Sequence, residues 1–184
     1  TVATGGTNVS FPAGTVSGTT QVVTVNIVDD ALLEGTEDLS IALSNISNPL
    51  VAMVDDAGTG TITDNEAPGA GDGISVANFT VAEDAGTADF VVTYTGPTVA
   101  DAFTVDFAVS DGTAIDPDDY TVATGGTNVS FPAGTTNGTT QVVTINIVDD
   151  ALLEGTEDLS IALSNISNPL VAMVDDAGTG TVTD

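Results

Sequence analysis

Two stretches of the chain have almost the same sequence and lie 120 positions apart. Residues 1–64 recur as residues 121–184, and only four positions differ: Val16/Thr136, Ser17/Asn137, Val25/Ile145 and Ile62/Val182. A period of this length is too long for a solenoid coil and is typical of self-contained domains in tandem. The sequence therefore predicts the C-terminal half of one repeat at 1–64, a Pro/Gly-rich linker at 65–73 and a complete repeat at 74–184.

The apolar residues of the repeat alternate with a period of two. Segments 90–94, 103–109, 143–147 and 159–163 follow this pattern, which is that of half-buried strands. Ile74 and Val76 share one parity whereas Phe79 and Val81 share the other, so we expect a bulge or a strand that changes sheets. With about seven strands in each unit, the predicted fold is all-β: an antiparallel, immunoglobulin-like β-sandwich in tandem repeats.

The charge of the chain excludes several classes of partner. There are 27 acidic residues and no Lys, Arg or His, which gives a formal net charge of -27. Nucleic acids and anionic membrane surfaces would repel such a chain. No apolar run is long enough to span a bilayer, so we expect no membrane insertion. A hydrophobic content of 41% nevertheless predicts a folded core rather than disorder.

The residues that are missing also limit the chemistry of the chain. Without His, Cys or Lys, the usual general bases, thiol nucleophiles, Schiff-base amines and zinc ligands are absent. Carboxylate pairs can serve a glycosidase, but there is no Trp and only 4% aromatic residues to form a sugar platform. We therefore expect no enzyme. Without Cys, a hard cation is the expected stabilising element in place of disulfides.

Acidic residues cluster at strand ends, where the loops of a sandwich meet at one pole. The groups are Glu83-Asp84; Asp116, Asp118 and Asp119; Asp149-Asp150 with Glu154; and Asp184. Any single Asp here is readily explained as a turn residue. Gathering all of them without a cation would cost several kcal/mol. Ca²⁺ accepts six to eight oxygen ligands in loose geometry and suits such loops better than Mg²⁺, which requires a strict octahedron.

These motifs together resemble a known family. The order is VAED, DGTAxxxxDY, FPAG, VTINIVDDALLEG and TVTD, and it is similar to the Calx-β domain. The resemblance covers residues 74–184, and residues 1–64 match its second half. Tandem, nearly identical copies are similar to the extender region of bacterial repeats-in-toxin adhesins.

The resemblance implies a set of Ca²⁺ ligands at one end of each sandwich. In the complete repeat the implied ligands are Glu83, Asp119, Asp149, Asp150, Glu154 and Asp184. In the half repeat they are Asp29, Asp30, Glu34 and Asp64, where partners equivalent to Glu83 and Asp119 are absent. Asp64, Glu66 and Asp72 could also hold an ion at the junction between repeats.

The function that this resemblance implies is mechanical. Ca²⁺ would neutralise the carboxylates and rigidify domains and linkers, so that a secreted, monomeric, rod-like stalk on a bacterial cell surface projects a distal binding region. Its partners would be Ca²⁺ and the neighbouring identical repeats. Identical copies also suit avidity, so a ligand-binding or homophilic adhesion module is the alternative.

Overall fold

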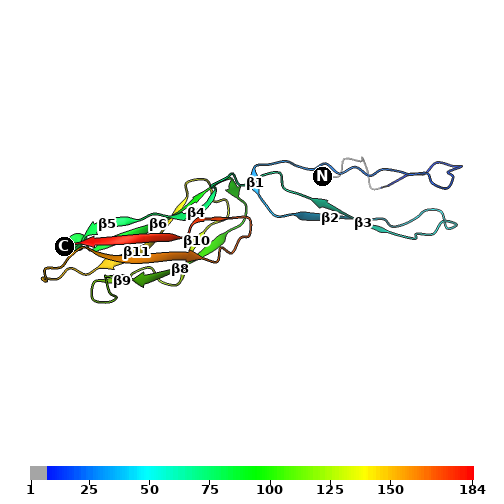
Figure 1. Cartoon of the computed structure of the whole chain (residues 1–184). Helices are drawn as coiled ribbons and strands as arrows, with labels where there is room; N and C mark the ends of the chain where they lie inside the picture. Colours follow the sequence, from blue (N-terminus) through cyan, green and yellow to red (C-terminus); the bar gives the residue numbers. More distant parts are fainter. Residues whose placement is uncertain (1–7) are drawn as a thin grey trace. The chain divides into compact units, whose positions relative to one another are not determined.

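The computed structural model of the chain describes residues 8–184, which divide into two compact units (Figure 1). The half-repeat unit contains the residues up to Asp30 together with 37–62. The complete-repeat unit contains residues 31–36 and 63–184. The short segment 31–36 therefore belongs to the second unit, although its sequence is part of the half repeat. The two units are described separately below.

Strands form nearly all of the regular structure. The half-repeat unit has β2 (Glu37–Ala42) and β3 (Ala57–Ile62). The complete-repeat unit has β1 (Leu32–Leu33), β4 (Gly73–Val76), β5 (Phe79–Ala82), the 3₁₀ helix η1 (Glu83–Ala85), β6 (Thr87–Thr95), β7 (Thr98–Val99), β8 (Phe103–Asp111), β9 (Tyr120–Val122), β10 (Asn128–Phe131), β11 (Thr140–Ile147), β12 (Glu157–Ser164), β13 (Met173–Asp175) and β14 (Ala177–Thr183). The predicted all-β class is confirmed.

The complete-repeat unit is a sandwich of two five-stranded sheets. One sheet has the order β10-β8-β12-β14-β5 and the other β13-β4-β6-β11-β9. The long strands β6, β11, β12 and β14 bury alternate residues, as the period of two predicts; in β12, Leu159, Ile161 and Leu163 are buried. Between the sheets, the ring of Phe103 stacks on that of Phe131 at a centroid distance of 4.9 Å.

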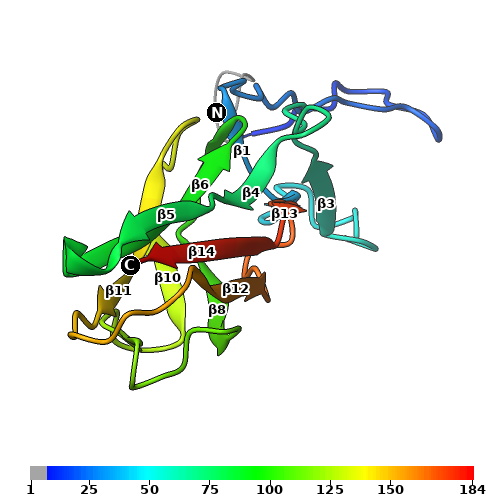
Figure 2. The same cartoon turned by 60° about the vertical axis from the view of Figure 1, so that its left-hand side comes forward.

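The first strand of the sandwich changes sheets, as the parity of its apolar residues predicts. β4 pairs antiparallel with β6, whereas β5, two residues later, pairs parallel with β14 in the other sheet (Figure 2). The ring of Phe79 lies against Gly180, where a Cβ would meet it at 2.4 Å. Only glycine at position 180 therefore lets β5 approach β14 so closely. The sheets are otherwise mainly antiparallel, with a second parallel pair between β13 and β4.

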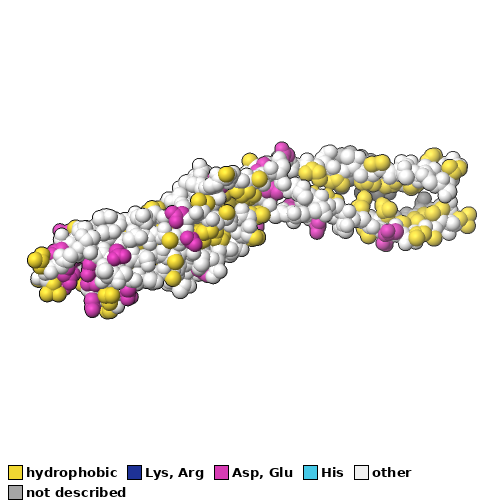
Figure 3. All heavy atoms as spheres, viewed as in Figure 1, with side chains coloured by type: hydrophobic (Ala, Val, Ile, Leu, Met, Phe, Trp, Pro, Cys, Tyr) yellow, Lys and Arg dark blue, Asp and Glu magenta, His cyan; other side chains and the backbone are white. Residues whose placement is uncertain are grey.

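In its described residues, 8–30 and 37–62, the half-repeat unit contains the same hairpin but no other strand of the sandwich. β2 pairs with β3 from Glu37↔Ile62, the register that Glu157↔Val182 has in the complete repeat. Because the covering strands of the first half are missing, side chains that form the core of the complete repeat are exposed here: Phe11 is 53% exposed and Phe131 0%. An open groove of about 360 Å³ lies between the β2–β3 hairpin and residues 9–23, and mainly apolar side chains line it (Figure 3).

Helical structure is minimal in the described part of the chain. Within residues 8–184, the structure contains no helix with the length and apolar character needed to cross a membrane.

Candidate metal centre

The loop between β8 and β9 carries Asp119 and is tied to the start of β12. The Tyr120 hydroxyl donates to Asp111 Oδ1 at 2.7 Å, which joins the two ends of the loop. The Thr113 hydroxyl donates to Asp158 Oδ1 at 2.9 Å, and the Asp158 N–H donates to Thr113 Oγ1 at 2.9 Å. These bonds hold the loop beside the first residues of β12, so that Asp119 faces the beginning of that strand.

The side chain and backbone of Asp119 are both anchored. Its Oδ2 accepts from the N–H of Ile115 at 2.7 Å. Its carbonyl oxygen accepts from the N–H of Val148, at the end of β11, at 2.9 Å. The position of this carboxylate is therefore set before any ion arrives, which lowers the entropy cost of binding one.

The loop between β11 and β12 approaches Asp119 from a second direction. The N–H of Glu154 donates to Asp184 Oδ2 at 2.9 Å, so the carboxylate that follows β14 holds this loop in place. The N–H of Asp150 donates to Glu83 Oε1 at 3.0 Å, which connects the same loop to η1. Acidic residues from three distant parts of the sequence are thus joined through backbone hydrogen bonds.

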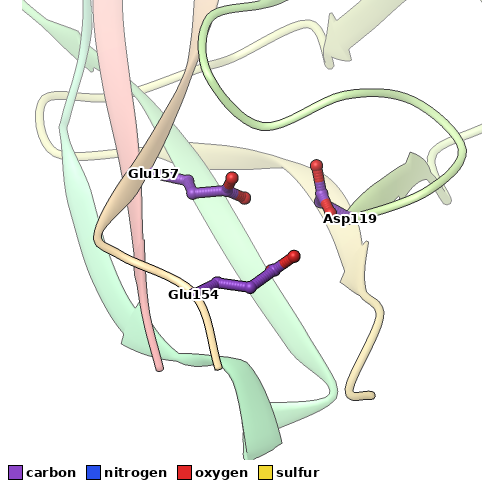
Figure 4. Close-up of side chains that lie close together, drawn as sticks. All are labelled: Asp119, Glu154 and Glu157. Atoms are coloured by element: carbon purple, nitrogen blue, oxygen red, sulfur yellow. The ribbon is translucent and has the colours of Figure 1, made fainter. Parts of the chain in front are cut away.

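Three carboxylates converge at the centre of this pole. One oxygen each of Asp119, Glu154 and Glu157 lies within 4.8 Å of the others, and the three side chains point toward a common space (Figure 4). All three are half-buried. The cavity beside them, which Glu83 and Asp184 also line, encloses about 10 Å³, roughly the space of one water-sized sphere. Such a space, lined by carboxylates as well as by Val148 and Val182, has room for a single hard cation.

The electrostatics of the pole disfavour an empty site. Burial raises the pKa of Glu154, and the charges of Asp150 and Asp119 raise it further. Burial also raises the pKa of Glu157, again with contributions from Asp119 and Glu154. The sequence has no Lys, Arg or His, so no side chain can offset this repulsion. A bound divalent cation would supply the missing positive charge.

The structure brings together most of the ligands implied for the complete repeat. Glu83, Asp119, Glu154 and Asp184 line the same cavity. Asp150 lies near enough to raise the pKa of Glu154, whereas Asp149 is exposed and does not line the cavity. Whether each of them binds an ion stays a prediction.

Sequence reasoning missed Glu157, one of the three converging carboxylates. Glu157 is the first residue of β12 and precedes the alternation that starts at Leu159. The signal that could have indicated it was its place at the start of an alternating strand, three positions after Glu154. The strand end faces the same pole as the loop before it.

The corresponding acids of the half repeat are divided between the two units. In the complete-repeat unit, Asp64 Oδ2 accepts from the N–H of Glu34 at 2.8 Å and Oδ1 from the N–H of Glu66 at 3.3 Å. The bond from Glu34 is the main cause that lowers the pKa of Asp64. Asp29 and Asp30 are exposed and belong to the half-repeat unit.

Asp72, the third residue of the predicted junction site, also accepts a hydrogen bond from the backbone. Asp72 Oδ2 accepts from the N–H of Gly69 at 2.7 Å, which closes a turn of the linker. An ion shared by Asp72 with Asp64 and Glu66 stays a prediction.

Comparison with known families confirms the resemblance to the Calx-β domain. The Calx-beta domain matches residues 4–66 and 72–183. The chain belongs to the Calx-beta domain family. The two matched stretches correspond to the half repeat and the complete repeat. The comparison with curated proteins gave no match.

Solved Calx structures share the sandwich. The apo form of the Calx CBD1 domain is 24% identical, with a TM-score of 0.51, covering 60% of this chain and 95% of that one. CBD12 from CALX1.2 is 26% identical with the same TM-score, and the match covers 60% of this chain but 43% of that one. The calcium binding domain CBD12 of CALX1.1 is 25% identical with a TM-score of 0.51; 60% of this chain and 45% of that one are covered.

The raised pKa values predict how the stability of the metal-free Calx-beta repeat depends on pH. A carboxyl whose folded pKa is raised stabilises the fold fully below its ordinary pKa, which is 4.5 for Glu, and loses this contribution as the pH rises through the folded value. In EDTA, the melting temperature should therefore rise as the pH falls from 7 to about 5. The lowered pKa of Asp64 acts in the opposite sense, but only below its ordinary value of 3.8.

The measurement is a series of thermal melts in EDTA, followed by tyrosine fluorescence. Both Tyr residues, Tyr94 and Tyr120, lie in the complete repeat, so the signal reports only that unit. The variant Glu157→Gln should have a flatter pH profile than the parent chain. A melting temperature that falls or stays constant over this range would contradict the predicted repulsion.

Proposed function

We propose that the chain is a calcium-binding extender repeat of a large, secreted, bacterial cell-surface adhesin, with a mechanical rather than a catalytic role. The observation that carries the proposal is the convergence of Asp119, Glu154 and Glu157 at one pole, in a chain that has no cationic side chain. Membership of the Calx-beta family supports the calcium part of the proposal. The near-identity of the repeats supports a spacer, because a spacer needs only to add length and can use interchangeable copies.

The donor set fits Ca²⁺ better than other metals. The candidate ligands are all carboxylates, which hard cations prefer, and the sequence has no His or Cys for zinc or copper. Asp119, Glu154 and Glu157 would hold the ion, with Glu83 and Asp184 lining the same cavity. Loops of unequal length offer the irregular coordination that Ca²⁺ tolerates and Mg²⁺ does not.

The consequence of binding would be rigidity. The ion would join the β8–β9 loop, the β11–β12 loop and the first residue of β12, which approach the pole separately. Acidic side chains are concentrated at this end of the complete-repeat unit (Figure 3). Neutralising them would remove self-repulsion from each repeat and from its junction with the next. In the proposed stalk, the partners are Ca²⁺ and neighbouring repeats of the same chain.

Calorimetric titration of Ca²⁺ into the full chain tests the site. We expect saturable binding, and Glu157→Gln should weaken the affinity about tenfold because one charged ligand is lost. The matched control is Glu37→Gln, the same position in the half-repeat unit, which should bind as the parent chain does. No saturable heat, or equal affinity in the Glu157 variant, would contradict the proposed site.

A second experiment separates the spacer from an adhesion module. The full chain is immobilised and exposed to a glycan array and to a second preparation of the same chain, in millimolar Ca²⁺. A spacer should show no saturable binding to either. Saturable binding to a glycan or to the chain itself would favour the adhesion module.

A further inference from the structure

Residues 31–36 pack onto the end of the sandwich that is opposite the acidic pole. β1 (Leu32–Leu33) pairs in parallel with β7 (Thr98–Val99), with Leu33 opposite Val99. The N–H of Ala100 donates to the carbonyl oxygen of Leu33 at 3.2 Å. Leu33 is only 3% exposed and belongs to the hydrophobic core of the complete-repeat unit. We call this end of the sandwich, around β7, the base.

The base receives Leu33 beside the two-residue strand β7, whose Val99 belongs to the hydrophobic core. Val99 is completely buried and is paired on its other side with Thr135. Its second edge is therefore available for strand addition, and β1 occupies it. Leu33 thereby joins the apolar interior at this end of the sandwich.

The same sequence lies at the other end of the repeat with its leucines in solvent. Residues 151–156, ALLEGT, are identical to residues 31–36. Leu152 is 64% and Leu153 94% exposed. The anchoring of the two loops is also the same, since the Glu154 N–H donates to Asp184 at 2.9 Å as the Glu34 N–H donates to Asp64 at 2.8 Å. Leu33 and Leu153 therefore differ in one respect: Leu33 packs against a base, whereas Leu153 has none to pack against in this structure.

We propose that the loop 151–156 is a docking element and that its occupant is the base of a further identical repeat. Leu153 would insert beside the valine that corresponds to Val99 in that repeat, and the loop would add a parallel strand to the corresponding edge. The contact joins two different surfaces, so it propagates head to tail and does not close into a ring. The inference deepens the proposed function and rests on its array of repeats, because it names the surfaces by which neighbouring repeats meet; the contact itself needs no metal.

The test uses the absence of Cys from the chain. Leu153→Cys is made in the full chain and in the same chain extended at its C-terminus by one further copy of residues 65–184. The rate at which a thiol reagent alkylates the single thiol is measured in both, in Ca²⁺. We expect alkylation at least roughly tenfold slower in the extended chain, because docking restricts access to brief local opening.

Two controls make the result decisive. Val54→Cys, at a position that is 97% exposed, should be alkylated at the same rate in both chains. Tyrosine fluorescence melts verify that each variant is folded. Equal rates for the Leu153 variant in the two chains would overturn the proposal. Calcium titration is a separate readout, so a chain that protects this thiol but binds no Ca²⁺ would contradict only the proposed function.

Discussion

Removal of Ca²⁺ with EDTA is expected to lower the melting temperature of the complete repeat by about 5–10 °C relative to 10 mM Ca²⁺. A site with a Kd of about 0.1–1 mM, the extracellular range, is stabilised by roughly 1.4–2.7 kcal/mol at that concentration. For a domain of this size, 1 kcal/mol corresponds to about 4 °C. The physical reason is the repulsion among Asp119, Glu154 and Glu157, which the ion relieves in the folded state only.

Tyrosine fluorescence and X-ray scattering are the two readouts for this prediction. The fluorescence follows the complete repeat alone, and the scattering reports whether the chain becomes more flexible without the ion. Mg²⁺ at the same concentration is the control and should stabilise less. Identical melting temperatures and radii of gyration in EDTA and in Ca²⁺ would rule out the calcium mechanism.

Phe131→Ala is expected to lower the free energy of unfolding of the complete repeat by about 3–5 kcal/mol. Phe131 is completely buried, and its ring is nearly parallel to that of Phe103, with an interplanar angle of 9°. The substitution leaves a cavity between the two sheets where the surrounding strands cannot close. Urea denaturation monitored by tyrosine fluorescence measures the change.

The repeat provides a matched control for this substitution. Phe11 occurs in the same sequence, NVSFPAGT, but is 53% exposed. Phe11→Ala should change the stability of the complete repeat by less than about 0.5 kcal/mol. Equal effects of the two substitutions would contradict the described difference in burial between the repeats.

The alternation of apolar residues was sufficient to predict most of the complete sandwich. It located β6, β8, β11 and β12, and it indicated the change of sheets between β4 and β5. Burial of one face requires a period of two, so the pattern is visible without any knowledge of partners. The loops that fix Asp119 could not be predicted, because their hydrogen bonds to Asp158 join residues far apart in the sequence.

The same local sequence does not form the same structure in both repeats. Residues 140–147 form β11, whereas 20–27, which differ only by Val25 in place of Ile145, show a single bridge. β11 is held between β6 and β9, and the half repeat lacks the counterpart of β6. A strand without partners is not stable, so the pattern alone predicts strand character but not strand formation.

The site was less predictable than the fold, for a related reason. Motif spacing pointed to Glu154 and Asp184, which the backbone hydrogen bond between them brings together. Glu157, which sequence reasoning missed, shows the limit of such reasoning. Which carboxylate of a loop turns inward depends on where the strand begins, and strand ends are the least certain feature of a sequence pattern.

The parallel pairing of β5 with β14 determines how the repeat would respond to tension. The chain enters the sandwich through β4 and β5 and leaves it after β14, and the two strands run in the same direction over Phe79–Ala82 and Gly180–Thr183. A force applied to both ends of the repeat pulls these strands past one another along their axes. The hydrogen bonds between the two strands then bear the load together, in shear, and do not break one after another.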